Sequence, residues 1–529
     1  MKSKSLYLKA NVLLEPLFNK WCAWSYLISP ATSAMYLANW HIKVMQSFVA
    51  APKIHMSALK NPKMQGGLFI NYDESRVNEI KYLLEKTTKE QAHILDFAKA
   101  IKTLDNILVK EATGYSLEPL YEQVPEILQG YVELVYDMNN HPSLRFIEGL
   151  LYTSQYYQQS SQSIALSLID RDKRSFIFST PRLPEDNSLH LNLPFSHPGL
   201  DELFQMKNNP NDFGSIKEIL GVQDKDEKLL TSFLTEDIPP VPPIYKGDNV
   251  RIRYFGHACI LIETKEISIL CDPLISYQYD NNICRYSYAD LPESIDYILI
   301  THQHHDHCHF ETLLQLRHKT KNIIVPRSHG GVLADPSLKL VLQNIGFERV
   351  LEIDELETLK TGSANIIGLP FFGEHGDLNI KTKMSYLVSL QEKSILIAAD
   401  SKTLEPKLYN RIHDVVGDID VLFIGVQCDG APLTWAYGSL LTQPLPRNMD
   451  QSRQVDGTNY EGAVEIVKRL YPQAVYVYAM GYEPWLSYLM SVQSTEESRP
   501  SKEAKKLIED CISRGITAEK LFGHKEIFL

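Results

Sequence analysis

The sequence predicts an α/β protein whose carboxyl-terminal half is built from layered sheets and helices, preceded by a mainly helical α+β domain. Two observations support this prediction. After residue 245, short apolar segments of strand length alternate with segments of helical spacing, the pattern of layered α/β folds. Before residue 245, the apolar residues of 76–110 mostly follow helical spacing.

The chain has 529 residues, which favours two domains. The proline-rich run at 239–243 is stiff and extended, and it can join neither a helix nor a central strand. We therefore predict an amino-terminal domain at 1–245 and a carboxyl-terminal domain at 246–529. The net charge of -12 argues against a partner nucleic acid, for which a basic face is expected.

Cysteine usage and the amino-terminal apolar stretch indicate the compartment. The seven cysteines form no C-x-x-C pair, as expected of reduced thiols in a cytoplasmic protein. The stretch 21–52 is interrupted by Pro30, His41 and Lys43, so it predicts core or interface helices and no membrane anchor. Aromatic residues in and near this stretch suit a subunit interface and a plain core equally: Trp21, Trp24, Tyr26, Tyr36 and Trp40.

The expected elements follow in chain order. The amino-terminal half is expected to hold two helices within 76–110, broken near Thr87 and Thr88, and strand-like pieces within 164–179, including 176–178. In the other half, strands are expected at 250–255, 259–263, 267–271, 297–301, 366–369, 385–390, 395–398, 421–426 and 474–478. Helices are expected there at 310–317, 336–344, 459–471 and 503–514.

The strongest chemical signal is the run His302-Gln303-His304-His305-Asp306-His307, directly after an apolar strand pattern. Histidine is the commonest metal ligand, and the close spacing of histidines in this run is typical of a metal-binding motif. His302 and His304 can converge on one ion, while Asp306 and His307 lie a turn further on and can face a second. Two metals roughly 3.5–4 Å apart can hold one small oxygen species between them.

Two further positions can complete a dinuclear site. Asp400 follows a strand-like segment at 394–399 and is placed to bridge two cations. Glu374 and His375 follow another strand and are adjacent, so only one of them is expected to face the metals. A histidine would give a nitrogen-rich, zinc-like hydrolytic site, whereas a glutamate favours iron or manganese.

Several motifs resemble known families. The segment 255–259 (Phe-Gly-His-Ala-Cys), Asp272-Pro273 and the H-x-H-x-D-H loop resemble the metallo-β-lactamase superfamily. The whole chain, including 61–67, 132–137 and 179–184, is most similar to diiron β-hydroxylases of the kind found in chloramphenicol biosynthesis. This resemblance implies an αββα metallo-β-lactamase sandwich as the catalytic domain at 246–529. It also implies that domain 1–245 forms a dimer and docks the substrate.

The resemblance implies an O2-dependent non-haem diiron monooxygenase of antibiotic biosynthesis. Its substrate would be an amino acid tethered to a carrier (thiolation) domain of a nonribosomal peptide synthetase, hydroxylated at the β-carbon. The two irons would be oxo- or hydroxo-bridged, and an electron-transfer reductase would supply electrons, because no flavin or nicotinamide fingerprint is present. The implied ligands are His302, His304 and Glu374 on one iron, Asp306 and His307 on the other, and Asp400 bridging, with Glu374 and Asp400 as the catalytic carboxylates and His375 turned away.

Three alternatives remain open. A dizinc hydrolase of a lactone, thioester or phosphoester usually supplies a late histidine, and here only His524 could fold back to do so. A flavodiiron reductase has glutamate at the second motif position, where this chain has His304, and carries a flavodoxin domain that we do not find. A non-enzymatic scaffold would require a vestigial ligand set. His257 and Asp272 are candidates to orient ligands, and Gln427 is a candidate to line the pocket.

Overall fold

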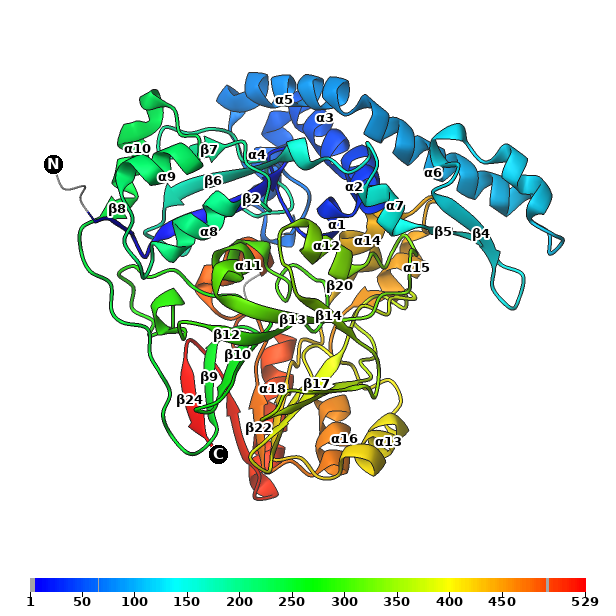
Figure 1. Cartoon of the computed structure of the whole chain (residues 1–529). Helices are drawn as coiled ribbons and strands as arrows, with labels where there is room; N and C mark the ends of the chain where they lie inside the picture. Colours follow the sequence, from blue (N-terminus) through cyan, green and yellow to red (C-terminus); the bar gives the residue numbers. More distant parts are fainter. Residues whose placement is uncertain (1–4, 65, 491–493) are drawn as a thin grey trace.

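The structure, a computed structural model, describes residues 5–64, 66–490 and 494–529. In the carboxyl-terminal half two seven-stranded sheets lie face to face, and an amino-terminal layer of helices and a smaller sheet packs against one side (Figure 1). The predicted fold class, an α/β sandwich after a mainly helical α+β region, is confirmed. No helix within the described residues is both long and apolar enough to span a bilayer.

The first sheet of the sandwich begins with an antiparallel meander and continues as parallel strands. The neighbours from β11 to β14 are parallel, while β9 pairs antiparallel with both β10 and β24, so the chain end returns to this sheet. Its spatial order is β14 (Val350–Ile353), β13 (Thr320–Pro326), β12 (Ile295–Leu299), β11 (Ser268–Cys271), β10 (Cys259–Glu263), β9 (Arg251–Gly256) and β24 (Lys525–Phe528).

The second sheet is antiparallel at one side and parallel at the other. Its order is β15 (Thr358–Lys360), β16 (Asn365–Leu369), β17 (Ser385–Leu390), β18 (Lys393–Ile397), β19 (Val421–Ile424), β22 (Ala474–Val477) and β23 (Thr517–Lys520). The strands from β18 to β23 are parallel. Inward-facing residues of both sheets form one core, including Ile252, Ile260, Val388, Ile395 and Phe423, because alternate side chains of a strand face the same side.

Helices cover the outer faces of both sheets. Against the second sheet lie α13 (Lys407–Val416), α16 (Tyr460–Leu470) and α18 (Arg499–Ser513), whose apolar sides share a core with it. Helices α11 (Phe310–Leu316) and α12 (Leu338–Asn344) lie between the first sheet and the amino-terminal layer. The other elements of this half are short: β20 (Ala431–Pro432), α14 (Leu433–Tyr437), α15 (Arg447–Ser452), β21 (Gln454–Val455) and α17 (Ser487–Met490).

The amino-terminal layer combines a four-stranded sheet with helices. The sheet has the order β3 (Trp21–Cys22), β2 (Val12–Phe18), β6 (Gln162–Leu168) and β7 (Leu189–Leu191), and β1 (Tyr7–Leu8) pairs with β8 (Leu234–Thr235). The hairpin of β4 (Val132–Tyr136) and β5 (Pro142–Phe146) projects to one side (Figure 1). The helices are α1 (Ser25–Ile28), α2 (Pro30–Tyr36), α3 (Ile42–Ala50), α4 (Pro52–Leu59), α5 (Val77–Glu90), α6 (Ala92–Glu111), α7 (Glu148–Tyr152), α8 (Pro198–Gln205), α9 (Phe213–Ile219) and α10 (Glu227–Ser232).

The segment between β8 and β9 contains the proline run and, in this described stretch, forms neither helix nor strand. The predicted boundary at 245 falls within it. Yet one hydrophobic core runs from the amino-terminal helices into the first sheet and α11, and joins Trp24 with Phe310. Because the two halves share this core, a division into 1–245 and 246–529 stays a prediction about independent folding units.

Some predicted elements differ from the observed ones. The helices within 76–110 separate at Gln91, not at Thr87, because Thr87 lies buried within α5 and its carbonyl accepts a hydrogen bond from the Gln91 N–H. The prediction of a strand at 176–178 is wrong: a turn forms at 177–179, and Phe178 packs against Trp40 and Trp435 instead of joining a sheet. The strand β13 was missing from the prediction because its polar first residues, 320–322, hide the period.

The parallel strands bring several loops to one edge of the sandwich. The segments after β11, β12, β18, β19 and β22 leave the carboxyl ends of parallel strands, so they meet above the two sheets. Crevices beyond the carboxyl ends of strands are the usual ligand sites of such sheets. The H-x-H-x-D-H loop follows β12, and Asp400 follows β18.

Candidate metal centre

The histidine-rich loop folds back on itself directly after β12. The carbonyl of His304 accepts hydrogen bonds from the N–H groups of His307 (3.1 Å) and Cys308 (2.8 Å), which closes a tight turn. This turn brings His307 next to His302, with 4.1 Å between their ring centroids. Both imidazoles are fully buried. The turn therefore folds residues that are consecutive in the sequence into a compact cluster of side chains.

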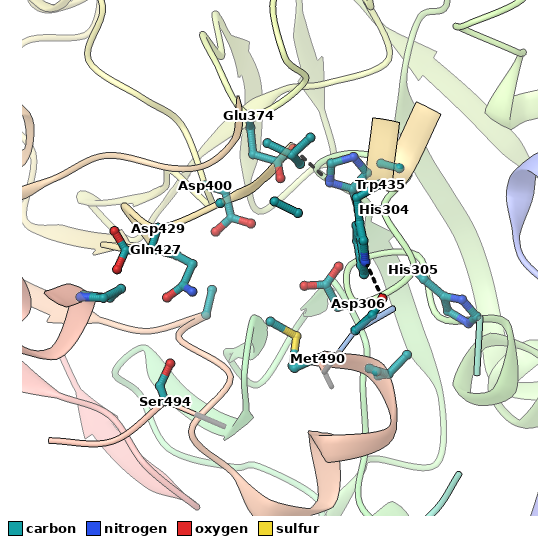
Figure 2. Close-up of a pocket in the computed structure, with 18 of the residues that line it drawn as sticks. His304, His305, Asp306, Glu374, Asp400, Gln427, Asp429, Trp435, Met490 and Ser494 are labelled. Atoms are coloured by element: carbon teal, nitrogen blue, oxygen red, sulfur yellow. Dashed lines mark hydrogen bonds and ion pairs between the residues drawn. The ribbon is translucent and has the colours of Figure 1, made fainter. Parts of the chain in front are cut away.

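One group of possible ligand atoms comprises His302, His304 and Glu374. The Nδ1 of His304 lies 2.8 Å from Oε2 of Glu374, and the Nε2 of His302 lies 3.7 Å from the same oxygen. Figure 2 shows Glu374 and His304 facing each other at the wall of the cavity. These donors come from two separate loops, after β12 and after β16, which only the fold brings together.

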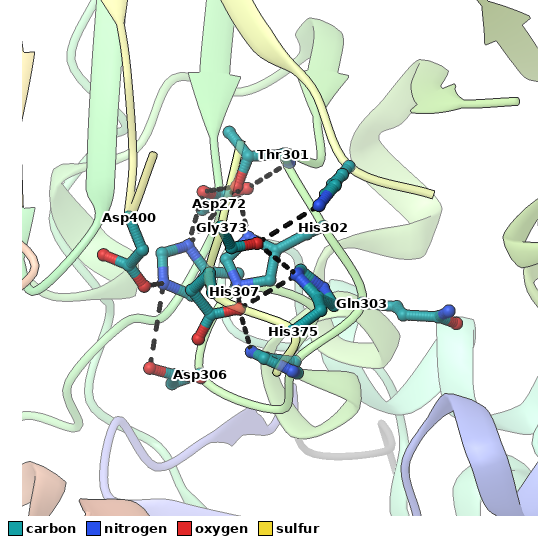
Figure 3. A network of polar contacts seen from close by, with 12 residues as sticks. Asp272, Thr301, His302, Gln303, Asp306, His307, Gly373, His375 and Asp400 are labelled. Carbon is teal, nitrogen blue, oxygen red and sulfur yellow. Dashed lines mark hydrogen bonds and ion pairs between the residues drawn. The ribbon is translucent and has the colours of Figure 1, made fainter. Parts of the chain in front are cut away.

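The second group lies around His307. Its Nε2 is 3.0 Å from Oδ2 of Asp400 and 3.7 Å from Oδ2 of Asp306 (Figure 3). His302, His307 and Asp400 form one possible metal-holding group here, and His257, Asp306 and His307 form another, so the three groups of the site share His302 or His307 and adjoin. All six ligands expected from the sequence therefore lie in one cluster: His302, His304, Asp306, His307, Glu374 and Asp400.

Unpartnered buried atoms test whether this cluster suits a pair of cations. The Nε2 of His302 and the Oδ1 of Asp400 are buried and make no hydrogen bond to any protein group that the structure describes. Buried polar atoms are rarely left without a partner, because desolvation is then uncompensated. Donors of this kind, part imidazole and part carboxylate, fit two iron ions.

The electrostatics of the cluster agree with cation binding. Burial raises the pKa of Glu374 to about 7, against the opposing attraction of His304. Burial also disfavours the ionised form of Asp306, yet His307 and His257 hold the pKa of this carboxyl well below its usual range. Burial likewise opposes charge on His307, but Asp400 and Asp306 raise the pKa of its imidazole. Bound cations would favour the ionised carboxylates and the neutral imidazoles.

Further residues fix the orientation of the ligands. The Nδ1 of His307 hydrogen-bonds with Oδ2 of Asp272 (2.7 Å), a fully buried carboxylate that also accepts from the backbone N–H (2.7 Å) and hydroxyl (2.6 Å) of Thr301. His257 Nε2 lies 2.9 Å from Oδ2 of Asp306. Carboxylate–histidine pairs of this kind set the ring orientation of metal ligands. Both candidates for orienting residues therefore contact the cluster.

The backbone around the cluster adopts conformations that few side chains tolerate. Glu374 (φ 67°), Asp272 (φ 39°) and His257 (φ 51°) lie in the left-handed region without being glycine. At Gly425, a Cβ would lie 2.7 Å from Oδ1 of Asp400, so glycine lets this strand end approach the carboxylate. Such strain is typical of functional sites, where surrounding packing determines an otherwise unfavourable conformation.

Three further residues near the motif or considered as ligands are His375, His524 and Cys308. The expectation that His375 turns away from the metals stays a prediction. Among the described residues, His375 belongs to none of the possible metal-holding groups; its ring stacks on His304 with 4.7 Å between centroids, and its Nδ1 lies 3.2 Å from the carbonyl oxygen of Gly373. His524 is exposed and contacts the carbonyl of Cys284, so it does not supply the late histidine of a hydrolase. Burial raises the pKa of the Cys308 thiol, which stays protonated in the core.

A cavity of about 520 Å³ opens onto the cluster. His304, Asp306, Glu374 and Asp400 line its inner end. One wall is aromatic and is formed by Trp24, Trp40, Phe178 and Trp435. The size and the apolar lining with few polar groups are those of a small-molecule site.

Sequence reasoning missed several of these residues. Trp21, Trp24, Tyr26, Tyr36 and Trp40 are all buried, so the subunit-interface interpretation of this aromatic group is wrong. Trp40 lies in a π-helical turn, Leu37–His41, between α2 and α3, and such turns are frequent at functional sites. Tyr437 of α14 contacts Nε2 of His304 at 2.6 Å. Tyr437 lies in an apolar segment without a recognisable motif, so the sequence did not predict its contact with His304.

Comparisons with known proteins agree with this geometry. Residues 7–238 match the family model of the diiron non-heme beta-hydroxylase N-terminal domain, and residues 251–477 match that of a beta-lactamase superfamily domain. The 4-amino-L-phenylalanyl-[CmlP-peptidyl-carrier-protein] 3-hydroxylase of Streptomyces venezuelae is 36% identical over 525 residues, which are 97% of this chain and 98% of that protein. A UPF0173 protein of Pyrococcus abyssi is 27% identical over 177 residues, which are 34% of this chain and 70% of that protein.

The solved structures point the same way. The crystal structure of CmlA, a diiron beta-hydroxylase from Streptomyces venezuelae, has a TM-score of 0.94 at 34% identity and covers 100% of both chains. Both the amino-terminal layer and the sandwich are thus common to the two proteins. This chain belongs to the diiron non-heme beta-hydroxylase family.

Proposed function

We propose that this enzyme hydroxylates the β-carbon of an amino acid held as a thioester on a carrier domain of a nonribosomal peptide synthetase, with O2 as co-substrate. The observation that carries the proposal is the cluster of three imidazoles and three carboxylates at the inner end of an apolar cavity. The relative from Streptomyces venezuelae supports it, because its name describes 3-hydroxylation of a carrier-bound aminoacyl group.

The residues that would hold the two irons follow from the three adjoining groups of donors. His302, His304 and Glu374 would hold one iron, and Asp306 and His307 the other. Asp400 is proposed to bridge, since its Oδ2 lies 3.0 Å from His307 Nε2 while its Oδ1 has no partner among the described residues. Iron bound here would supply the activation of O2, with electrons from an external reductase.

The chain itself contributes orientation and exclusion of water. Asp272 holds the ring of His307, and Tyr437 contacts that of His304, so both imidazoles keep a fixed orientation. The aromatic wall of Trp24, Trp40 and Trp435 excludes water and offers planar surfaces to an apolar substrate side chain. Tethering to a carrier domain would hold the β-carbon near the carboxylates and lower the entropic part of the barrier.

We also propose that the chain forms a homodimer through its amino-terminal region. Exposed apolar side chains support this: Tyr82 is 67% exposed, Tyr115 83% and Met138 97%, on α5, after α6 and on the projecting β4–β5 hairpin. Sedimentation equilibrium tests it, with a dimer mass expected for the parent and a monomer mass for Tyr115→Lys. A monomeric parent at micromolar concentration would contradict the proposal.

Mass spectrometry of aminoacyl carrier domains tests the reaction. A panel of carrier domains, each loaded with one amino acid, is incubated with the iron-loaded enzyme, O2 and a reductant. The expected product has gained one oxygen atom at the β-carbon, and Glu374→Ala abolishes the gain. Cleavage of the thioester without O2 consumption would instead show a hydrolase and overturn the proposal.

A further inference from the structure

Gln427 is a polar side chain of the cavity that the metal cluster does not use. It follows β19 at the same edge as Asp400, and its backbone carbonyl accepts a hydrogen bond from Gly457 N–H (2.8 Å), which fixes its position. Its side chain lines the cavity. Figure 2 shows Gln427 between Asp400 and Asp429, across the cavity from His304 and Trp435.

The amide oxygen of Gln427 stabilises no other described part of the protein by a hydrogen bond. Oε1 is buried and accepts no hydrogen bond from any protein group that the structure describes. Leaving such an acceptor unsatisfied costs about 1–3 kcal/mol, so a buried acceptor of this kind normally serves a ligand or a water molecule. The three possible groups of metal donors hold three side chains each without it.

The carboxylates near Gln427 differ from its amide oxygen, because each of them is either partly exposed or part of the metal cluster. Asp429 also lines the cavity, but its carboxylate is half exposed and lies 3.1 Å from the guanidinium of Arg499. The other carboxylates of the cavity, Asp306, Glu374 and Asp400, belong to the metal cluster. The amide oxygen of Gln427 is thus a neutral acceptor that pairs with no cationic side chain among the described residues and belongs to none of the possible metal-holding groups.

An aminoacyl thioester offers one group that matches such an acceptor. Its carboxyl carbon is tied up in the thioester, while its α-ammonium carries N–H donors and a positive charge. The β-carbon and the ammonium are both attached to the α-carbon, on different bonds. A side chain against the aromatic wall and an ammonium against Gln427, on opposite sides of the cavity, leave the β-carbon between them, beside Asp400 and Glu374.

We infer that the Oε1 of Gln427 accepts a hydrogen bond from the α-ammonium of the tethered amino acid, and that this contact selects aminoacyl groups over acyl groups without the amine. The inference rests on the proposed function, which it refines by naming a specificity-determining residue. Hydrogen bonds to charged groups contribute enough to change affinity roughly 10- to 100-fold.

Binding to two matched probes tests the inference without turnover. The first probe is a carrier domain that bears 4-amino-L-phenylalanyl through a stable amide in place of the thioester. The second bears 3-(4-aminophenyl)propanoyl, which lacks only the α-amine. Affinities are measured by calorimetry under anaerobic conditions for the iron-loaded parent, Gln427→Leu, Gln427→Glu and the control Gln223→Leu, an exposed glutamine that does not line the cavity.

The parent and Gln223→Leu are expected to bind the amine-bearing probe roughly 10- to 100-fold more tightly than the other. Gln427→Leu should lose most of this preference and bind the second probe as the parent does, whereas Gln427→Glu, which keeps an acceptor, should retain it. Equal preference in Gln427→Leu and the parent would overturn the inference alone. If the parent binds neither probe and hydroxylates no member of the aminoacyl panel, the proposed function fails as well.

Discussion

Replacing Asp272 by asparagine isolates the role of one buried carboxylate in holding the metal centre. Asp272 accepts three hydrogen bonds, two from Thr301 and one from His307, at 2.6–2.7 Å. Asparagine has nearly the same shape, and it tolerates the left-handed backbone at this position (φ 39°) better than most residues. The substitution therefore changes hydrogen bonding and charge but little else.

The magnitude follows from the positions of the donors. The Thr301 N–H points to Oδ1, whereas its hydroxyl and the His307 ring point to Oδ2. Whichever way the amide is turned, its NH2 group faces another N–H donor, and a buried donor loses its partner at a cost of about 1–3 kcal/mol. Loss of the carboxylate that orients a metal-binding histidine typically lowers metal affinity roughly 10- to 100-fold.

Anaerobic equilibrium dialysis against Fe(II) measures this effect, and urea unfolding monitors the fold. The matched control is Asp296→Asn. Oδ2 of Asp296 also accepts from a backbone N–H (2.9 Å) and a hydroxyl (3.1 Å), both of Ser268, but within the described residues no histidine bonds to it. Asp272→Asn should lose iron affinity while Asp296→Asn keeps it. Unchanged iron affinity in Asp272→Asn would refute the idea that this carboxylate orients His307.

Three further outcomes follow from particular contacts. Tyr437→Phe removes the hydroxyl 2.6 Å from Nε2 of His304 and should lower iron affinity roughly tenfold in the same dialysis; no change would show that the contact is dispensable. Burial raises the pKa of Glu15, but two buried arginines outweigh this effect and lower the pKa from 4.5 to about 2. The ionised carboxylate therefore stabilises the folded state above pH 4.5, and this stabilisation is lost as the pH falls toward 2. Urea midpoints should therefore fall less between pH 5 and 3 in Glu15→Gln than in the parent, and parallel curves would contradict the assignment. Gly331→Ala would place a Cβ 1.9 Å from a backbone oxygen at the end of β5 and should cost about 1–3 kcal/mol in urea unfolding. This cost should exceed that of Gly330→Ala, whose Cβ would meet no atom of the described residues within 4 Å; equal effects would refute the steric argument.

The sequence predicted the parts of the site that are local. His302, His304, Asp306 and His307 lie within one loop, so their convergence required only a turn after a buried strand. Asp400 was predicted from its place at a strand end, because parallel strands bring their carboxyl ends to one edge. The choice between Glu374 and His375 depended on family resemblance, because adjacent residues in a loop can face either way.

Long-range features could not be predicted from the sequence. The aromatic wall joins Trp24 and Trp40 from the amino-terminal layer with Trp435 from the short helix α14, some 400 positions later. Neither segment has a period or motif that links it to the other. The short strand β14 (Val350–Ile353) was missed for a related reason, since an edge strand of four residues carries too little pattern to separate it from a loop.

The central claim is that Glu374, and not His375, completes a pair of iron sites. Metal analysis of anaerobically purified parent, Glu374→Gln and His375→Gln tests it most directly. We expect two irons per chain in the parent, as in a diiron enzyme, retention of both in His375→Gln and loss of iron in Glu374→Gln. Zinc in the parent, or full iron in Glu374→Gln with loss in His375→Gln, would contradict the claim.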